Sequence, residues 1–272
     1  MSQVFEITKE VFKGESGVKI EWSLELSPRT FQPRDHFLIW IMSHDRLEDI
    51  DTFDKFYTLL QKLQPPHNVM KLLNSSQSQT NAVGLRLTHF DINGRKCIYL
   101  DSENCTSKKR SIRAIKWHNQ SVQEEVTYQS FLITNNKNLL VPLEHIHSSL
   151  REFAKELFLV TNNRKQFSYS YQYRNKKVNE VYFTFPWHPQ LKTIIKSLPA
   201  HYQNYKNELL SIHGHRYFRH IGLSSSSLSF PKMTIYFSGH VDQRWPESFQ
   251  QLQEQVNESS KNAHAFLDEL TI

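Results

Sequence analysis

Glycine and cysteine are scarce in this chain of 272 residues, which has seven glycines and two cysteines. The glycines form neither a G-x-G-x-x-G motif nor a Walker-type loop, which disfavours dinucleotide and P-loop chemistry. A G-x-S-x-G nucleophile elbow is also missing. Cys97 and Cys105 cannot form a zinc site alone, so we expect two free thiols.

Long hydrophobic runs are missing too. The longest, FLIWIM at 37–42, is far shorter than the roughly 20 residues of a membrane helix, and the opening MSQVFEITKE lacks the apolar core of a signal peptide. Hydrophobic residues make up 38% and charged residues 22%, as in globular proteins. No Pro-rich or Gly-rich linker interrupts the chain. We therefore expect a cytoplasmic protein with one domain over residues 1–272.

The chain is basic, with a formal net charge of +6 and a pI near 9.1. Such a charge favours an anionic partner, which could be a nucleic acid, a membrane surface or a phosphorylated small molecule. The densest basic clusters, SKKRSIR at 107–113 and RNKK at 174–177, are interpreted as solvated turns.

Pairs of strand-like segments alternate with helical ones. Four pairs are clear, at 19–26 and 36–43, 82–90 and 95–101, 166–173 and 179–185, and 216–223 and 232–238. A further strand is expected at 111–117. Helices are expected at 47–63 with Asp45 as N-cap, 121–132, 142–159, 188–198, 201–212 and from Trp245 onward.

This order indicates an α+β fold, with one antiparallel sheet and helices outside it. A closed barrel suits eight or more strands, because closure removes exposed edges. Helices outside would cover the oily strand faces, so the polar faces would point into the central channel, which we call the lumen. The alternative is an open sheet whose polar face meets water.

Side-chain alternation assigns residues to the polar face. KIEWSLEL places Glu21 there, and PKMTIYFSG places Lys232 and Tyr236 there. A two-residue turn at Asn93-Gly94 would set Thr88 opposite Tyr99 and Arg86 opposite Asp101, with Ile92 facing Arg95 and Phe90 facing Cys97.

The third pair carries most of the tyrosines. A turn at Asn175-Lys176 would set Tyr171 opposite Glu180 and Tyr169 opposite Tyr182. All three tyrosines would then lie in the lumen, with Ser168, Ser170, Val181 and Phe183 on the reverse face. Tyrosines on several strands favour a lumen over a water-facing surface, because water would meet their large apolar rings.

These side chains suit the ionisation of an allylic diphosphate and the capture of its cation. Arg86, Arg95 and Lys232 could bind the diphosphate through charge-assisted hydrogen bonds. Glu21 could accept a proton or steer a cationic transition state. Tyrosine rings could shield the cation, and the candidates are Tyr99, Tyr169, Tyr171, Tyr182 and Tyr236.

Two other clusters favour simpler interpretations. Asp45, Glu48, Asp49 and Asp51 lack D-D-x-x-D spacing and fit a helix N-terminus. The group His213, His215 and His220 has no Cys or carboxylate nearby in the sequence to complete a metal site.

The chain resembles the ABBA-type prenyltransferases, most closely the cyanobactin prenyltransferases that modify ribosomally made cyclic peptides. The similarity covers residues 19–240. It is carried by KIEWSLEL, HFLIWIMS, GRKCIYLD, NEVYFTF and GLSSSSLSFPKMTIYF in that order.

The resemblance implies a barrel of about ten antiparallel strands around an isoprenoid diphosphate. Glu21 matches the acidic position of the first strand. The basic position of the second strand falls near His36, where this chain departs from the pattern unless Arg34 substitutes. Arg95, or Lys96 after a one-residue shift, matches the next basic position. Tyr182 and Tyr236 match tyrosines of the last two hairpins.

We therefore expect transfer of a dimethylallyl or geranyl group from its diphosphate to a side chain of a linear or macrocyclic peptide. Any Mg²⁺ would be held mainly by the diphosphate, and neither nucleic acid nor membrane is expected as a partner. The alternatives are a basic nucleic-acid-binding module and a catalytically inactive barrel that binds a pathway partner.

Overall fold

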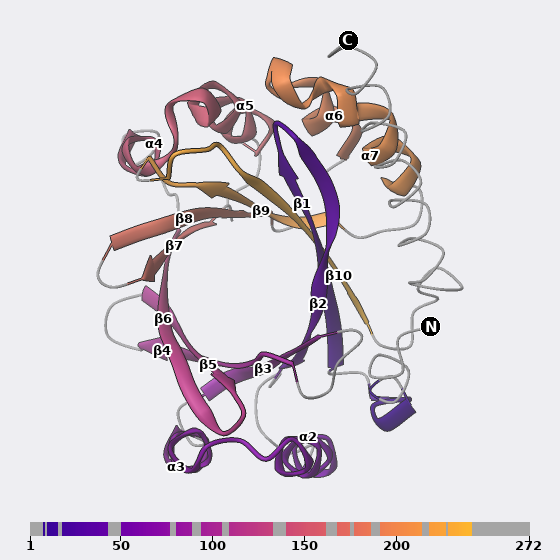
Figure 1. Ribbon diagram of the computed structural model, residues 1–272, viewed down its shortest axis with the longest axis vertical. Coiled ribbons are helices and arrows are strands. Elements are labelled where there is room, and N and C mark those ends of the chain that lie inside the picture. The colour runs from indigo at the N-terminus through magenta and orange to yellow at the C-terminus, as the bar shows by residue number, and fades with distance from the viewer. Residues whose placement is uncertain are drawn as a thin grey trace.

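Ten antiparallel strands close into a barrel in the computed structural model, with helices outside the wall (Figure 1). Around the barrel the strands run in the order β1-β10-β9-β8-β7-β6-β5-β4-β3-β2, so strands consecutive in sequence are neighbours and β1 closes against β10. The structure describes residues 8, 10–15, 18–42, 50–76, 80–88, 94–104, 109–132, 140–161, 168–174, 177–185, 191–213, 218–226 and 228–240.

The strands form five successive hairpins whose turns all lie at one end of the barrel, here called the hairpin end. Their bounds are β1 Val18–Ser27, β2 Thr30–Met42, β3 Thr80–Thr88, β4 Lys96–Asn104, β5 Lys109–His118, β6 Ser121–Leu132, β7 Ser168–Arg174, β8 Lys177–Thr184, β9 Phe218–Ser224 and β10 Met233–His240.

The helices lie in the connections at the other end of the strands. They are α2 Ile50–Lys62, α3 His67–Ser76, α4 Leu140–His145, the 3₁₀ helix η3 Ser148–Leu150, α5 Arg151–Thr161, α6 Leu191–Lys196, the 3₁₀ helix η4 Ala200–Tyr205 and α7 Lys206–His213. Figure 1 shows α2 and α3 on one side of the barrel and α4 to α7 on the opposite side. Within the described residues, no helix is both long and apolar enough to cross a membrane.

Two hydrophobic clusters follow from the alternation of side chains along the strands. The larger one fills the space between the outer barrel wall and the helices, and in it Trp22 stacks on Phe237 with ring centroids 4.3 Å apart. The smaller one, with Leu38, Tyr99 and Ala114, faces the lumen. The barrel wall therefore buries an apolar outer face against the helices. Its inner face carries both apolar and polar side chains, as expected from the sequence.

The expected helix at 121–132 is wrong, because these residues form β6, the partner of β5. The strand expected at 111–117 is confirmed as β5 and completes the fifth hairpin with β6. On the outer face of β6, Gln123, Glu125 and Gln129 are exposed. This polar outer face removed the oily alternation that identified the other strands.

The basic cluster at 107–113 was also misread in part, since β5 begins at Lys109 and includes residues 109–113. In the other cluster, Arg174 ends β7 and Lys177 begins β8. Helix α3 was not anticipated from the sequence. The proposed cap Asp45, the acidic residues Glu48 and Asp49, and the helix from Trp245 lie outside the described residues.

Strand registers decide which side chains reach the lumen. In the β3–β4 pair, Arg86 lies opposite Cys97 and not Asp101, and Gly84 lies opposite Tyr99, because the pairing is centred earlier in the chain than an Asn93-Gly94 turn would place it. This shift is an even number of residues, so Arg86 and Tyr99 keep the inward face expected for them.

The β7–β8 register differs from expectation by one residue, which reverses the faces of β7. Ser170 lies opposite Tyr182, and Tyr169 lies opposite Phe183. Tyr169 and Tyr171 therefore belong to the outer hydrophobic cluster. Placing them in the lumen was wrong, whereas Tyr182 does point inward.

Candidate functional site

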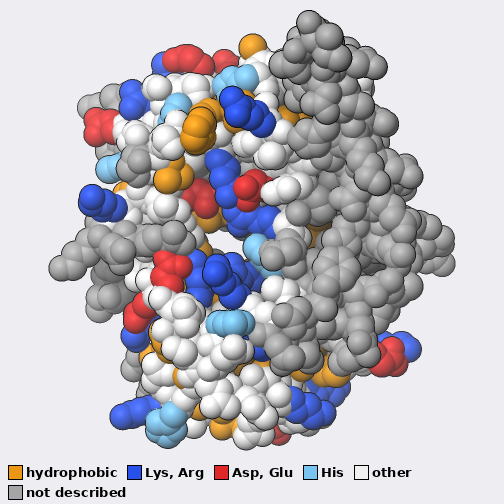
Figure 2. Space-filling model, viewed as in Figure 1, with side chains coloured by type: hydrophobic (Ala, Val, Ile, Leu, Met, Phe, Trp, Pro, Cys, Tyr) orange, Lys and Arg blue, Asp and Glu red, His pale blue; other side chains and the backbone are white. Residues whose placement is uncertain are grey.

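The lumen carries a concentration of charge. Figure 2 shows a hollow at the centre of the molecule, with Lys, Arg, Asp, Glu and His side chains gathered around it. The ionic and hydroxyl groups on this inner surface come mainly from β1, β2, β8, β9 and β10, where the hydrogen bonds described below connect them. Across the lumen, β3 to β6 contribute Arg86 and several aromatic rings.

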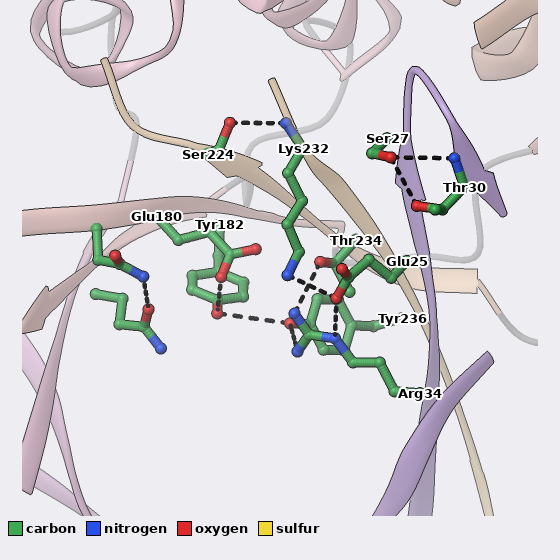
Figure 3. Close-up of polar contacts among 12 residues, drawn as sticks. Glu25, Ser27, Thr30, Arg34, Glu180, Tyr182, Ser224, Lys232, Thr234 and Tyr236 are labelled. Carbon is green, nitrogen blue, oxygen red and sulfur yellow. Dashed lines mark hydrogen bonds and ion pairs between the residues drawn. The ribbon is translucent and has the colours of Figure 1, made fainter. Parts of the chain in front are cut away.

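A three-residue ion cluster lies near the hairpin end (Figure 3). Glu25 Oε2 accepts from Arg34 Nε at 3.2 Å and contacts Lys232 Nζ at 2.6 Å. These residues come from β1, β2 and the segment that leads into β10, and β1 pairs with β2 on one side and with β10 on the other. One carboxylate thus holds two cations in fixed positions at the lumen wall.

Arg34 also reaches two hydroxyl groups of β10. Its Nη1 donates to Tyr236 Oη at 3.4 Å and its Nη2 donates to Thr234 Oγ1 at 3.3 Å. Burial opposes the charged form of Arg34, but Tyr236, Glu180, Tyr182 and Glu25 together outweigh it and raise the Arg34 pKa. The guanidinium stays charged under all physiological conditions.

A chain of hydroxyl groups continues from Tyr236. Its Oη donates to Tyr182 Oη at 3.5 Å, and Tyr182 Oη donates to Glu180 Oε2 at 2.7 Å. Burial is the main cause that raises the pKa of both phenols, so both tyrosines are neutral at physiological pH. Figure 3 shows the chain running across the inner faces of β8 and β10.

Glu21 lies deeper along β1, towards the helix-connected end. Its Oε2 is 3.5 Å from His220 Nε2, and His220 Nδ1 is 2.9 Å from Thr184 Oγ1. Burial raises the pKa of Glu21 to about 8, and Arg219 partly offsets this rise. At pH 7 Glu21 is therefore mostly a neutral carboxylic acid that can donate a hydrogen bond.

Aromatic rings form a continuous arc around the inner wall. Ring centroids are separated by 5.7 Å from Trp40 to Tyr99, 6.1 Å from Tyr99 to Tyr128, 5.7 Å from Tyr128 to Tyr182 and 5.7 Å from Tyr182 to Tyr236. The arc joins β2, β4, β6, β8 and β10. It lines the lumen with π faces and edges while the phenols remain hydrogen-bonding groups.

Arg86 lies on the same wall as this arc. Burial opposes its charged form, but Tyr99, Cys97 and Tyr128 more than offset burial and raise the Arg86 pKa, while Arg34 acts in the opposite direction. Its Nε finds no hydrogen-bond partner among the described residues. Two mutually repelling guanidinium groups therefore share one lumen, an arrangement that an anion between them would stabilise.

The predicted site residues that line the lumen divide into two groups. The structure brings together Arg34, Lys232, Tyr182 and Tyr236 as one hydrogen-bonded cluster, and it places Glu21, Arg86 and Tyr99 elsewhere on the inner wall. His36 is half-buried on β2, two residues beyond Arg34. Both residues therefore lie on β2, and Arg34 is the one that joins the ion cluster.

The remaining candidates lie elsewhere. Arg95 is exposed and precedes β4, and the Nζ of Lys96 donates to Gly94 O at 3.1 Å. Tyr171 packs edge-on against His145 of α4, and Tyr169 packs against Tyr171. Cys97 is a buried free thiol, as expected.

Sequence reasoning missed Tyr128, Glu180, Glu25 and Thr234 as members of the network. Tyr128 was missed because β6 was read as a helix. Alternation puts Glu25 on the same face of KIEWSLEL as Glu21, but alternation alone cannot identify its partners. Thr234 shares a face with Lys232 and Tyr236, and in the structure it accepts a hydrogen bond from Arg34.

No group of three or more His, Cys, Asp or Glu side chains in the described part of the chain could hold a metal ion. His213, His215 and His220 do not change this, since residue 215 is not described.

Comparison with known proteins adds no assignment. No protein-family model matches this chain, and no curated protein matches it significantly.

Proposed function

We propose that this protein is a prenyltransferase that moves a dimethylallyl or geranyl group from its diphosphate to a side chain of a ribosomally made peptide. The observation that carries the proposal is the meeting of Arg34, Arg86 and Lys232 with a five-ring aromatic arc on the inner wall of a closed barrel. The resemblance of the sequence to ABBA-type prenyltransferases supports the same assignment.

The cations supply the binding and leaving-group chemistry. A guanidinium can contact a phosphate through two parallel hydrogen bonds, and an ammonium adds a compact charge. Arg86, whose Nε is unpartnered among the described residues, has hydrogen-bonding capacity to offer a diphosphate. As the allylic C–O bond breaks, its electron pair moves to the diphosphate, and these cations stabilise the growing negative charge.

The aromatic arc could stabilise the allylic cation that forms when the diphosphate leaves. An allylic cation is attracted to the negative faces of aromatic rings, and rings packed around it keep water away until the acceptor attacks. Tyr99, Tyr182 and Tyr236 belong to the arc, together with Trp40 and Tyr128. The phenols are neutral at physiological pH, and burial raises their pKa further, so they do not act as anionic nucleophiles toward the cation.

Glu21 has the chemistry of an orienting group. As a mostly neutral acid at pH 7 it can donate a hydrogen bond to the acceptor, which refines its expected role as a proton acceptor. Mg²⁺, when bound, would supply further neutralisation of the diphosphate charge. The oxygens of the diphosphate would hold the ion, beside the cations named above.

Location distinguishes this proposal from a nucleic-acid-binding module. A sequence-tolerant single-strand surface combines a basic groove with accessible stacking platforms. Here the arginines and tyrosines converge on the inside of a closed wall instead of spreading over an open face. This convergence favours a small anionic substrate.

The direct test is product mass. The protein is incubated with dimethylallyl or geranyl diphosphate, Mg²⁺ and linear and macrocyclic peptides carrying Tyr, Trp, Arg, His, Ser or Thr. We expect one peptide class to gain one isoprenyl group. Arg34→Gln should abolish most of this transfer, whereas Arg113→Gln, which breaks an Arg–Glu pair outside the barrel, should not. No mass gain with either donor on any peptide would overturn the proposal.

A further inference from the structure

The hydroxyl chain between Arg34 and Glu180 has a single direction. Arg34 donates to Tyr236, Tyr236 donates to Tyr182, and Tyr182 donates to Glu180. Each phenol therefore has its own proton committed to the next oxygen in the chain. A hydroxyl group donates one hydrogen bond and accepts two, so Tyr236 Oη retains one acceptor position after the bond from Arg34.

We infer that Tyr236, Tyr182 and Glu180 form a proton relay that carries the acceptor's proton out of the reaction centre. This inference rests on the proposed function. Glu180 does not touch the acceptor in this scheme and acts through the two tyrosines. Its role differs from that of Glu21, which lies on β1 beside His220.

The surroundings of Glu180 fit a terminal proton acceptor. The residue is buried, with 8% of its surface exposed, and its Oε1 has no hydrogen-bond partner among the described residues. Gly222 on β9 makes room for it, because a Cβ at that position would lie 2.3 Å from Glu180 Oε1. The charged and titratable groups that act on Glu180 are Tyr182, Tyr236 of β10, Tyr128 of β6 and Arg34 of β2.

The atoms and electrons balance along the relay. The acceptor heteroatom X of an X–H group attacks the allylic carbon, forming an X–C bond, while the C–O bond breaks and its electron pair leaves with the diphosphate. The X–H proton passes to Tyr236 Oη, the Tyr236 proton passes to Tyr182, and the Tyr182 proton passes to Glu180 Oε2. Arg34 stabilises the partial negative charge that develops on Tyr236 during this shift.

The contact lengths differ along the chain. The Tyr182–Glu180 bond is short at 2.7 Å, whereas the Arg34–Tyr236 and Tyr236–Tyr182 contacts are 3.4 and 3.5 Å. Proton transfer needs heavy atoms within about 2.6–3.2 Å of each other. The relay therefore includes small movements of the Tyr236 and Tyr182 rings that shorten the two longer contacts.

The test compares transfer by the wild type with transfer by Glu180→Gln and Tyr182→Phe. Both substitutions keep side-chain size, and Phe keeps the ring of the aromatic arc. We expect kcat to fall by about 100-fold or more, as for loss of a general base, with the donor dissociation constant little changed. Tyr202→Phe is the matched control, because it removes a buried phenol of η4 outside the barrel.

Solvent isotope effects separate a relay from a structural role. In mixtures of H₂O and D₂O, wild-type kcat should show a curved dependence on deuterium fraction, because several protons move together. Both variants should lose this curvature, and Tyr202→Phe should keep it. Variants that retain wild-type kcat and curvature would overturn the relay alone. A wild type that transfers nothing would overturn the proposed function, and the relay with it.

Discussion

The Glu21 carboxyl group loses most of its hydration inside the barrel, and this loss raises its pKa to about 8 from an ordinary value of 4.5. Between these two pH values the unfolded chain has released the proton that the folded chain retains. The folded state then binds more protons than the unfolded state, so the contribution of Glu21 to stability falls as pH rises through this window. Above about pH 8 the contribution is constant.

The pH dependence of the Glu21 contribution predicts how the stability of the wild type differs from that of the Glu21→Gln variant. Relative to that variant, the wild type should lose free energy of unfolding between pH 4.5 and pH 8, by a total of at most about 5 kcal/mol. Urea unfolding of both proteins at five pH values from 5 to 9 provides the measurement. The control is Glu10→Gln, whose side chain is 76% exposed, and its difference from wild type should change little over the same range. A Glu21→Gln difference that does not vary with pH would contradict the assignment.

At the scale of whole elements, tyrosines on opposite faces of the β7–β8 hairpin should respond differently to substitution. Tyr171 packs outward against His145 of α4, while Tyr182 of β8 points inward to Tyr236. Tyr171→Ala should therefore lower the free energy of unfolding by about 3–5 kcal/mol, as for other buried aromatic residues, and leave the donor dissociation constant unchanged.

Tyr182→Ala should instead weaken donor binding, because it opens the aromatic arc and removes a hydroxyl from the inner network. Chemical unfolding and titration of each variant with dimethylallyl diphosphate separate the two effects. Equal losses of donor affinity in both variants would mean that β7 presents its tyrosines to the lumen after all.

Strand β7 shows what the sequence can and cannot predict. Alternation in QFSYSYQY correctly predicts a strand, but its face depends on pairing, and a one-residue change of register moves every side chain to the opposite face. In β3–β4 the register was wrong by an even number of residues, so Arg86 and Tyr99 still face inward. For β6, the outer face carries exposed polar residues such as Glu125 and Gln129, so the sequence lacks the alternation of apolar residues that predicts a strand.

At the scale of the whole molecule, four repeated strand pairs were enough to predict a closed antiparallel barrel with a polar interior. The partners inside it were not predictable, because Glu25, Arg34 and Lys232 meet only through the pairing of β1 with β2 and β10. Closure of the barrel also places Arg34, Arg86 and Lys232 on a concave inner surface. Their field is concentrated inside the barrel, which favours a compact anion of high charge over an extended polyanion.

This concentration of charge predicts selective stabilisation by inorganic pyrophosphate. A ligand that binds only the folded state at 100 times its dissociation constant adds about 2.7 kcal/mol to stability, and for a protein of this size that raises the Tm by roughly 5–10 °C. Thermal unfolding with pyrophosphate, phosphate or a single-stranded oligonucleotide at equal charge concentration makes the comparison. We expect the order pyrophosphate, phosphate, oligonucleotide.

The triple variant Arg34→Gln, Lys232→Met, Glu25→Gln should lose most of the shift with pyrophosphate. It keeps side chains of similar length and removes both cations that Glu25 holds, and Glu25→Gln avoids leaving an unpaired, partly buried carboxylate. The matched control is Arg113→Gln with Glu125→Gln, which removes an ion pair from the outer wall and should retain the full shift. A larger Tm increase with the oligonucleotide than with pyrophosphate would mean that basic residues outside the lumen form the principal anion site.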